Sequence, residues 1–224
     1  MDSSSVALLC LEAMGSAGLP CQGNSHETLL TLYLGRKTYL SPQAASPQSY
    51  HLAVQTGEPG FLSVALTAPE GLFGTTAHRF QLEAAGVEGR TVITLRSSYV
   101  PSVVTRLMTA IYLATLGRNK VGFSQEDGVP TTPPRYVKGF RALVERSAMR
   151  YYLAFETYLD MRSVPAADRF EACINAVYDS MERYPAQLHD MEKAEYLDAK
   201  RRERENQFRL QRELDAPRPR PKDG

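Results

Sequence analysis

The chain has 224 residues, enough to bury a substantial core, and its hydrophobic (43%) and charged (23%) fractions are those of an ordinary globular protein. Its 26 basic and 25 acidic residues leave a net charge of +1, which provides no general attraction to nucleic-acid phosphates, so no nucleic-acid partner is expected. The uncharged run 107–117 is shorter than the ~20 residues that a spanning helix needs, so no transmembrane segment is expected.

The first half of the chain has the pattern of consecutive antiparallel strands. Apolar and polar residues alternate with a period of two, as in Phe80, Leu82 and Ala84, which a half-buried strand requires. Glycine-containing turns separate the segments. We therefore predict a β-meander of about five to six strands, with strands near 28–34, 50–56, 61–67, 78–84 and 91–99.

At Pro101 the apolar spacing changes to three and four, which predicts a helix that starts there and stops at Gly117. The glycine- and proline-rich segment 121–134 predicts a loop, with room for a short strand around 121–124.

The longest predicted helix covers residues 137–160. At 100° per residue, its bulky apolar residues fall within about one third of the circumference. A stripe of this kind has to cover an apolar surface, and the meander is the sheet available, so we predict that this helix packs on the sheet. The stripe comprises Phe140, Leu143, Val144, Ser147, Tyr151, Ala154, Phe155 and Tyr158.

Two further helices are expected after Pro165. The first buries Phe170, Cys173, Ile174, Val177 and Met181 and ends at Pro185. The second, 186–214, has almost no apolar face around 200–206, so we expect it to leave the body. Residues 215–224 are expected to be disordered and residues 1–27 to form an irregular N-terminal remnant.

The sequence contains no recognisable catalytic or cofactor-binding motif. It lacks a glycine-rich phosphate loop, a GxSxG elbow, HExxH and CxxC. The four histidines, His26, His51, His78 and His189, are scattered and are read as structural or surface residues. We therefore predict no cofactor, no metal and no catalytic residue.

The three cysteines give an ambiguous signal. Cys10 and Cys21 could form one bridge in an oxidising compartment or remain buried thiols, while Cys173 falls at an apolar helix position and is read as core filler.

Four segments carry a resemblance to a known family: Leu32–Lys37, Ala68–Gly71, Tyr112–Phe123 and Val144–Leu153. With the predicted sheet and long helix, they resemble uncharacterised bacterial proteins of the START-like helix-grip group (the polyketide cyclase and lipid transport superfamily). The resemblance implies an α+β fold: an antiparallel meander packed on a long C-terminal helix in residues 28–185, followed by additional helices. It also implies a cavity between sheet and helix, and a periplasmic or envelope location. Such proteins usually have an export signal, a strand and two helices ahead of the position of residue 28, most of which this chain lacks.

On this basis the favoured hypothesis is non-catalytic binding of a lipid or another hydrophobic small molecule in that cavity. Arg146 and Arg150 flank the apolar stripe, where they would meet a ligand headgroup or simply extend over the core edge. Arg118 and Lys120 could likewise hold a lipid head or complement a helix dipole. The candidate ligand-binding residues are Tyr33, Arg96, Phe140, Val144, Ser147, Arg150, Tyr151 and Phe155.

Three alternatives remain open. In the first the stripe closes a solid core, in the second the fold hosts a cyclase- or hydratase-like enzyme, and in the third the protein is a structural envelope protein without a ligand. In the last case it would act through the charged C-terminal helix and the apolar 102–116 helix, the segments for which a peripheral membrane contact is considered.

Overall fold

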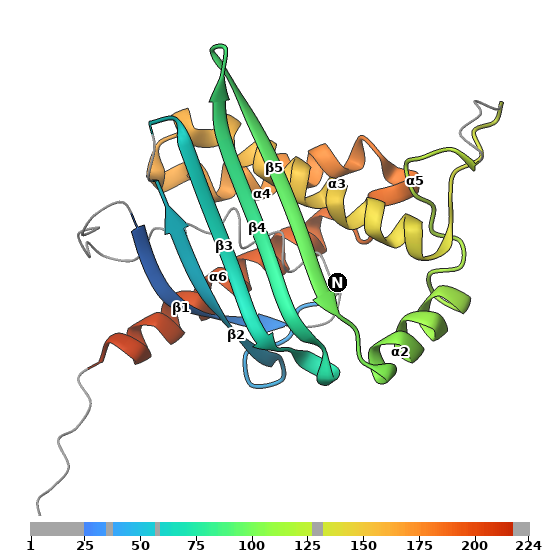
Figure 1. Ribbon diagram of the computed structural model, residues 1–224, viewed down its shortest axis with the longest axis horizontal. Helices are drawn as coiled ribbons and strands as arrows, with labels where there is room; N and C mark the ends of the chain where they lie inside the picture. The colour runs from blue at the N-terminus through green and yellow to red at the C-terminus, as the bar shows by residue number, and fades with distance from the viewer. Residues whose placement is uncertain (1–24, 35–37, 57–58, 127–131, 217–224) are drawn as a thin grey trace, which may run out of the picture. The chain divides into compact units, whose positions relative to one another are not determined.

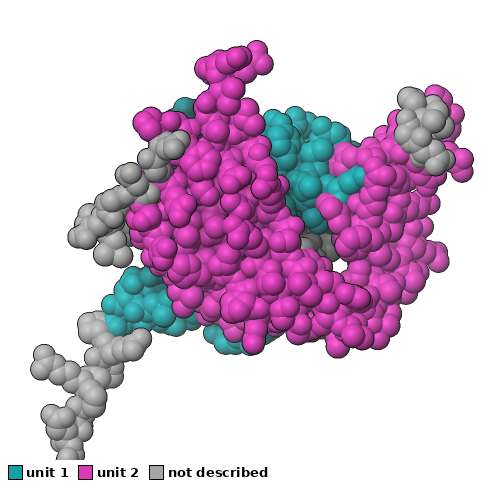
Figure 2. Space-filling model, in the orientation of Figure 1, with its two compact units in different colours: residues 1–13, 35–45, 145–224 teal, residues 14–34, 46–144 magenta. Residues whose placement is uncertain are grey.

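The computed structural model describes residues 25–34, 38–56, 59–126 and 132–216. The chain divides into two compact units, and each is described by itself (Figure 2). One unit holds the strands, and the other holds most of the helices. The predicted α+β class is confirmed.

The strand unit, which is unit 2 in Figure 2, contains a five-stranded antiparallel sheet (Figure 1). Neighbouring strands follow one another in the chain, so the predicted meander is confirmed. The strands are longer than predicted because backbone pairing continues through polar residues that carry no alternating hydrophobic signal. The strands are β1 (Ser25–Leu34), β2 (Ser46–Gln55), β3 (Phe61–Glu70), β4 (Thr76–Val87) and β5 (Arg90–Val100).

The turn between β4 and β5 explains the tightness of that hairpin. Val87 pairs with Arg90, which leaves Glu88 and Gly89 as the two loop residues, and both have positive φ, 50° and 74°. Two residues with positive φ match the backbone twist of antiparallel strands, as in a type I′ turn.

The pairing register assigns the side chains of the sheet to two chemically different faces. Residues paired across strands point to the same side. One row across the sheet is Val54, Val64, Leu82 and Leu95, and the row beside it is Gln55, Ser63, Glu83 and Thr94. The predicted alternation is therefore confirmed, with one apolar face and one polar face.

Helix α2 (Val103–Ala114) follows the sheet and belongs to the same unit. It begins after Ser102 rather than at Pro101, because the Ser102 hydroxyl accepts a hydrogen bond from the Thr105 amide at 3.1 Å and caps the helix. It ends at Ala114, three residues before the predicted stop. The short strand considered at 121–124 is not formed, and in its place is an isolated bridge between Gln125 and Tyr136.

The helical unit contains the second half of the chain from residue 145 onward, together with the described segment 38–45. Its core includes Leu153, Phe170, Ile174, Val177 and Leu188, all buried. The predicted buried face of the helix after Pro165 is confirmed. The helices of the chain's second half are α3 (Gly139–Asp160, in this unit from residue 145), η3 (Met161–Ser163), α4 (Ala166–Glu182), α5 (Pro185–Leu188) and α6 (Lys193–Asp215).

The prediction that the charged C-terminal helix leaves the body is wrong. Tyr196 and Lys200 of α6 are buried, and the Arg204 guanidinium lies 4.2 Å from the centre of the Phe170 ring. Further along, the Asn206 amide donates a hydrogen bond to the Tyr39 hydroxyl at 2.6 Å. The prediction failed because long basic side chains cover apolar surface with their stems and stack on aromatic rings.

The expected helix at 186–214 is also interrupted. Residues 189–192 separate α5 from α6, and Pro185 begins α5 instead of ending α4. The predicted disorder falls mainly on residues 217–224, which lie outside the described residues, as do residues 1–24 of the predicted remnant.

Cys173 is not simply a core filler. It is buried in α4, but it is also disulfide-bonded. Its partner lies outside the described residues, where the other two cysteines, Cys10 and Cys21, occur. The Cys10–Cys21 pairing considered from the sequence lies outside the described residues. None of the helices in the described residues is long and apolar enough to cross a membrane.

Candidate ligand-binding face

The apolar face of the sheet extends across all five strands of the strand unit. It is built from every second residue of each strand, and most of its side chains are only half-buried. Its buried members are Ala68, Leu82 and the polar Gln48, whose amide donates a hydrogen bond to the Glu70 carbonyl. A half-exposed face of this kind can still bury apolar surface against another molecule.

One row of this face ends in a polar aromatic cluster. Ala68 pairs with His78, so His78 points to the apolar side along with Leu66 and Phe80. The His78 ring is stacked on Tyr99, with 5.4 Å between centroids and 11° between planes. Tyr50 meets the His78 ring edge-on at 6.2 Å. We call Tyr50, His78 and Tyr99 the ring cluster.

Hydrogen bonds fix which nitrogen of His78 carries the proton. The Thr75 hydroxyl donates to the carbonyl of Leu72 at 2.8 Å, so it accepts from His78 Nε2 at 2.7 Å. In the neutral imidazole, Nδ1 is then a hydrogen-bond acceptor. Within the described ranges, neither this atom nor the Tyr50 or Tyr99 hydroxyl has a hydrogen-bond partner. The cluster therefore presents three polar groups to a neighbouring molecule.

A β-bulge positions the histidine. The β4–β5 register shifts between Thr76 and Arg79, so that Ala77 and His78 together oppose Tyr99. Ala77 has φ 52°, a left-handed conformation that is uncommon for a residue with a side chain. The bulge lets His78 lie flat against Tyr99.

Gly71 provides the space for this arrangement. A Cβ atom at Gly71 would lie 2.1 Å from His78 Nε2 and 2.6 Å from the Thr75 hydroxyl oxygen. No side chain fits there while the His78–Thr75 hydrogen bond is kept.

Partial burial tunes the ionisation of the cluster. Desolvation lowers the pKa of His78 and raises that of Tyr50, since it disfavours the charged form of each. The neutral imidazole is thereby favoured.

Two of the sequence-predicted site residues lie on the other face of the sheet. Tyr33 is in register with Pro47, and Arg96 with Gln81, which places both on the polar side. There Arg79, Gln81 and Glu83 form a chain of hydrogen bonds along β4. Tyr33 and Arg96 therefore do not join the apolar face.

The remaining predicted residues lie on α3. Phe140 and Val144 are 60% and 50% exposed, so these two members of the predicted buried stripe are not buried. Ser147, Tyr151 and Phe155 are half-buried. Ala154, another member of the stripe, is fully buried as predicted. The rest of the most buried side of α3 is adjacent to the predicted stripe and carries Ala142, Arg146, Arg150, Leu153 and Thr157. The sequence analysis placed the two arginines at the edge of the apolar stripe, because their hydrogen-bonding partners are distant in the sequence and could not be identified from it.

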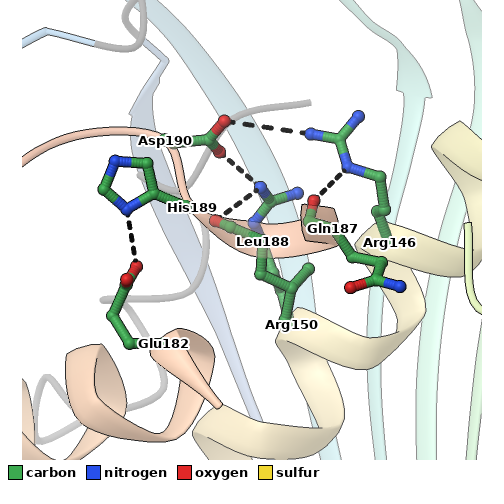
Figure 3. Close-up of polar contacts among 7 residues, drawn as sticks. All are labelled: Arg146, Arg150, Glu182, Gln187, Leu188, His189 and Asp190. Atoms are coloured by element: carbon green, nitrogen blue, oxygen red, sulfur yellow. Dashed lines mark hydrogen bonds and ion pairs between the residues drawn. The ribbon is translucent and has the colours of Figure 1, made fainter. Parts of the chain in front are cut away.

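Arg146 and Arg150 are held by the end of α5 and by Asp190, which follows it (Figure 3). Arg146 Nε donates to the Gln187 carbonyl at 2.7 Å, and its guanidinium lies 3.9 Å from the Asp190 carboxylate. Arg150 donates to the same carboxylate and lies 3.5 Å from the Leu188 carbonyl. Nearby, His189 Nδ1 lies 2.9 Å from the Glu182 carboxylate. These contacts give Arg150 a structural role that anchors the α5–α6 connection.

A small cavity of about 10 Å³ lies beside this anchor. Its lining includes Arg150, Tyr178, Leu188, Asp190 and Tyr196. The volume accommodates about one water molecule, too little for an organic ligand.

No group of three His, Cys, Asp or Glu side chains in the described part of the chain is arranged to hold a metal ion. Comparison with protein-family models, with curated proteins and with solved structures finds no match. The START-like resemblance therefore stays a prediction.

Sequence reasoning missed the ring cluster, although the signal was present. In the alternating pattern of each strand, His78 falls on the same side as Phe80 and Leu82, and Tyr50 falls on the same side as Leu52 and Val54. The bulge that aligns His78 with Tyr99 has no signature in the alternation, so the contact itself could not be predicted.

Proposed function

We propose that the protein binds a lipid or another hydrophobic small molecule, without catalysis, against the apolar face of β1–β5. The half-exposed apolar side chains that continue across the strands of that face carry the proposal. The sequence analysis expects the helix at 137–160 to close the other side of the binding cavity, and this stays a prediction.

The ring cluster gives the proposed ligand an orientation. Small-molecule sites combine an apolar lining with a few polar groups that fix the ligand's direction. The Tyr50 and Tyr99 hydroxyls can donate to a ligand oxygen, and His78 Nδ1 can accept from a hydroxyl or a protonated carboxyl group. A molecule with an apolar body and one small polar end fits this pattern best.

The hydrophobic effect is large enough to drive such binding. Each buried methylene contributes about 0.8 kcal/mol, so an acyl chain of about ten carbons gains on the order of 8 kcal/mol. Lost motion of ligand and protein offsets part of that gain, so micromolar affinity is a reasonable expectation.

The first test is native mass spectrometry of the full chain purified without detergent. We expect a population whose mass exceeds the chain mass by that of a lipid or similar molecule, identified after organic extraction. Absence of a co-purified molecule, together with no binding of fatty acids or phospholipids added to the protein, would contradict the proposal.

A matched pair of variants locates the site. Val64→Trp places a bulky ring in the centre of the apolar face, whereas Ser63→Trp places the same ring on the polar face of the same strand. We expect Val64→Trp to reduce ligand uptake at least tenfold and Ser63→Trp to leave it near wild type, with both variants checked for folding by circular dichroism. Equal uptake by the two would place the ligand elsewhere.

The cyclase- or hydratase-like alternative is favoured by one observation, the neutral imidazole of His78 on the apolar face. A neutral imidazole can act as a general base. If the recovered molecule changes mass or chromatographic retention during incubation with the protein, and His78→Gln stops that change, the enzyme assignment replaces the binding one. A molecule that stays unchanged supports binding alone.

A further inference from the structure

Helix α2 presents its apolar side outward. Val103, Leu107 and Ile111 are 82%, 60% and 55% exposed, and Val104 and Met108 beside them are also exposed. Their spacing of three and four places them on one side of the helix. On the opposite side, Thr105, Thr109, Tyr112 and Leu113 are half-buried. The helix therefore turns a largely hydroxyl-bearing side toward the protein and an apolar stripe away from it.

The helix is fixed to the sheet unit in this orientation. The Ser102 hydroxyl, which caps α2, donates a hydrogen bond to the Phe73 carbonyl at 2.6 Å. Phe73 belongs to η1 (Leu72–Gly74), the short helix between β3 and β4, and is itself 60% exposed. At the other end, Tyr112 packs against Gly117, where a Cβ atom would lie 2.7 Å from the Tyr112 ring. The N-terminal end of α2 is thus tied to η1, the C-terminal end packs on the residues that follow it, and the apolar stripe is left open.

The stretch of sequence that contains α2 carries charge of one sign. Residues 89–125 contain no Asp or Glu, although the whole chain is nearly neutral. Their charged residues are Arg90, Arg96, Arg106, Arg118 and Lys120. Arg106 and Arg118, within α2 and just beyond it, are exposed. An apolar stripe whose charged neighbours in the sequence are cations is complementary to a bilayer surface that contains anionic lipids.

We propose that α2 docks the protein on anionic membrane surfaces, with Val103, Leu107 and Ile111 entering the boundary between headgroups and acyl chains and Arg106 and Arg118 contacting phosphates. The helix lies in the plane of the interface, since it is much shorter than a spanning segment. This docking does not depend on a ligand at the apolar face of the sheet.

The test is co-sedimentation of the full chain with vesicles. We expect binding to vesicles of phosphatidylcholine mixed with phosphatidylglycerol, at least tenfold weaker binding to phosphatidylcholine alone, and weakening as salt rises from ~0.1 to ~1 M because charges are screened. Arg106→Gln combined with Arg118→Gln should remove most of the preference for anionic vesicles.

A matched pair of variants distinguishes the contribution of the apolar stripe from a general effect of added negative charge. Leu107→Glu and Ser98→Glu each add one carboxylate at an exposed position, but Ser98 lies on the polar face of the sheet. We expect Leu107→Glu to lower vesicle binding at least tenfold and Ser98→Glu to change it less than twofold. Equal losses would overturn the proposal, as would a wild-type chain that does not bind anionic vesicles.

Tryptophan fluorescence gives a second readout, because the chain contains no tryptophan. The emission of Leu107→Trp should shift to the blue when anionic vesicles are added, as the indole leaves water. A second copy of the chain is the competing occupant of the stripe. If sedimentation velocity finds a dimer that Leu107→Glu dissociates, and Leu107→Trp emission does not respond to vesicles, α2 is a self-association surface and the membrane proposal is wrong.

Discussion

The carboxylate of Asp190 lies between two buried guanidinium groups and accepts a hydrogen bond from Arg150 while lying 3.9 Å from Arg146. Both arginines come from α3, and Asp190 comes from the connection between α5 and α6. One acidic side chain thus compensates two cations in the interior of the helical unit (Figure 3).

Removing this carboxylate should be costly. We expect Asp190→Ala to lower the free energy of unfolding by about 3–5 kcal/mol, because two buried charges lose their counter-ion. Urea denaturation followed by circular dichroism measures the change. Asp179→Ala is the control, since Asp179 pairs with Lys193 at the surface and should contribute no more than about 1 kcal/mol. Similar effects from the two variants would show that the Asp190 contacts are not the anchor.

The lowered pKa of His78 predicts a pH dependence of stability. An unfolded histidine titrates near 6.5, so as the pH falls below about 6.5 the unfolded chain takes up this proton before the folded chain does. The free energy of unfolding should therefore decrease from that pH down to the folded pKa of His78. His78→Phe keeps a ring beside Tyr99 but removes this contribution.

Urea denaturation of both proteins at several pH values between about 5 and 8 provides the comparison. His78→Phe leaves every other titratable group in place, so the difference between the two curves reports on His78, and burial raises the pKa of the neighbouring Tyr50 further from this range. Parallel curves for wild type and His78→Phe would mean that His78 is not desolvated.

We expect Gly71→Ala to disrupt the ring cluster. Backbone strain would not be the cause, because Gly71 has an extended conformation with φ −138°. Its new methyl group would displace His78 from Thr75, and we expect a loss of about 1–3 kcal/mol and altered His78 ring signals in NMR spectra. Gly86→Ala meets only the Gly60 carbonyl oxygen, at the ordinary contact distance of 3.7 Å, and should be nearly neutral. Unchanged His78 signals in Gly71→Ala would contradict the close approach.

Reduction should destabilise the helical unit through Cys173. A disulfide of a small protein typically contributes about 2–5 kcal/mol, partly by restricting the unfolded chain. We expect a reducing agent to lower the melting temperature of the wild-type chain and to leave that of Cys173→Ser unchanged. Peptide mapping without reduction should recover Cys173 in a linked peptide. Recovery of Cys173 as a free thiol would contradict the bridge.

The sheet was predictable because its information is local. The alternation at Tyr50–Val54 and Phe80–Ala84 identified strands and also the side to which each residue points. The buried side of α3 was not predictable, because the burial of Arg146 and Arg150 depends on a carboxylate about forty residues away in the chain. Patterns of hydrophobicity contain no such pairing.

The candidate site was predictable only in part, for a similar reason. The alternation along each strand determined which residues lie on the same side of that strand. With the pairing register known, it would also have shown that Tyr33 and Arg96 lie on the polar face, and both would have been left out of the candidate site. The ring cluster depends on a bulge and on the absence of a side chain at Gly71, features that involve backbone geometry rather than composition.

Ligand contact with the apolar face is tested most directly by tryptophan quenching with a brominated fatty acid. Leu95→Trp and Thr94→Trp place the only tryptophan of the chain on the apolar and polar faces of the same strand. Because bromine quenches only at close range, our account predicts saturable quenching of Leu95→Trp and little quenching of Thr94→Trp. Equal quenching of both variants, or none in Leu95→Trp at saturating fatty acid, would contradict it.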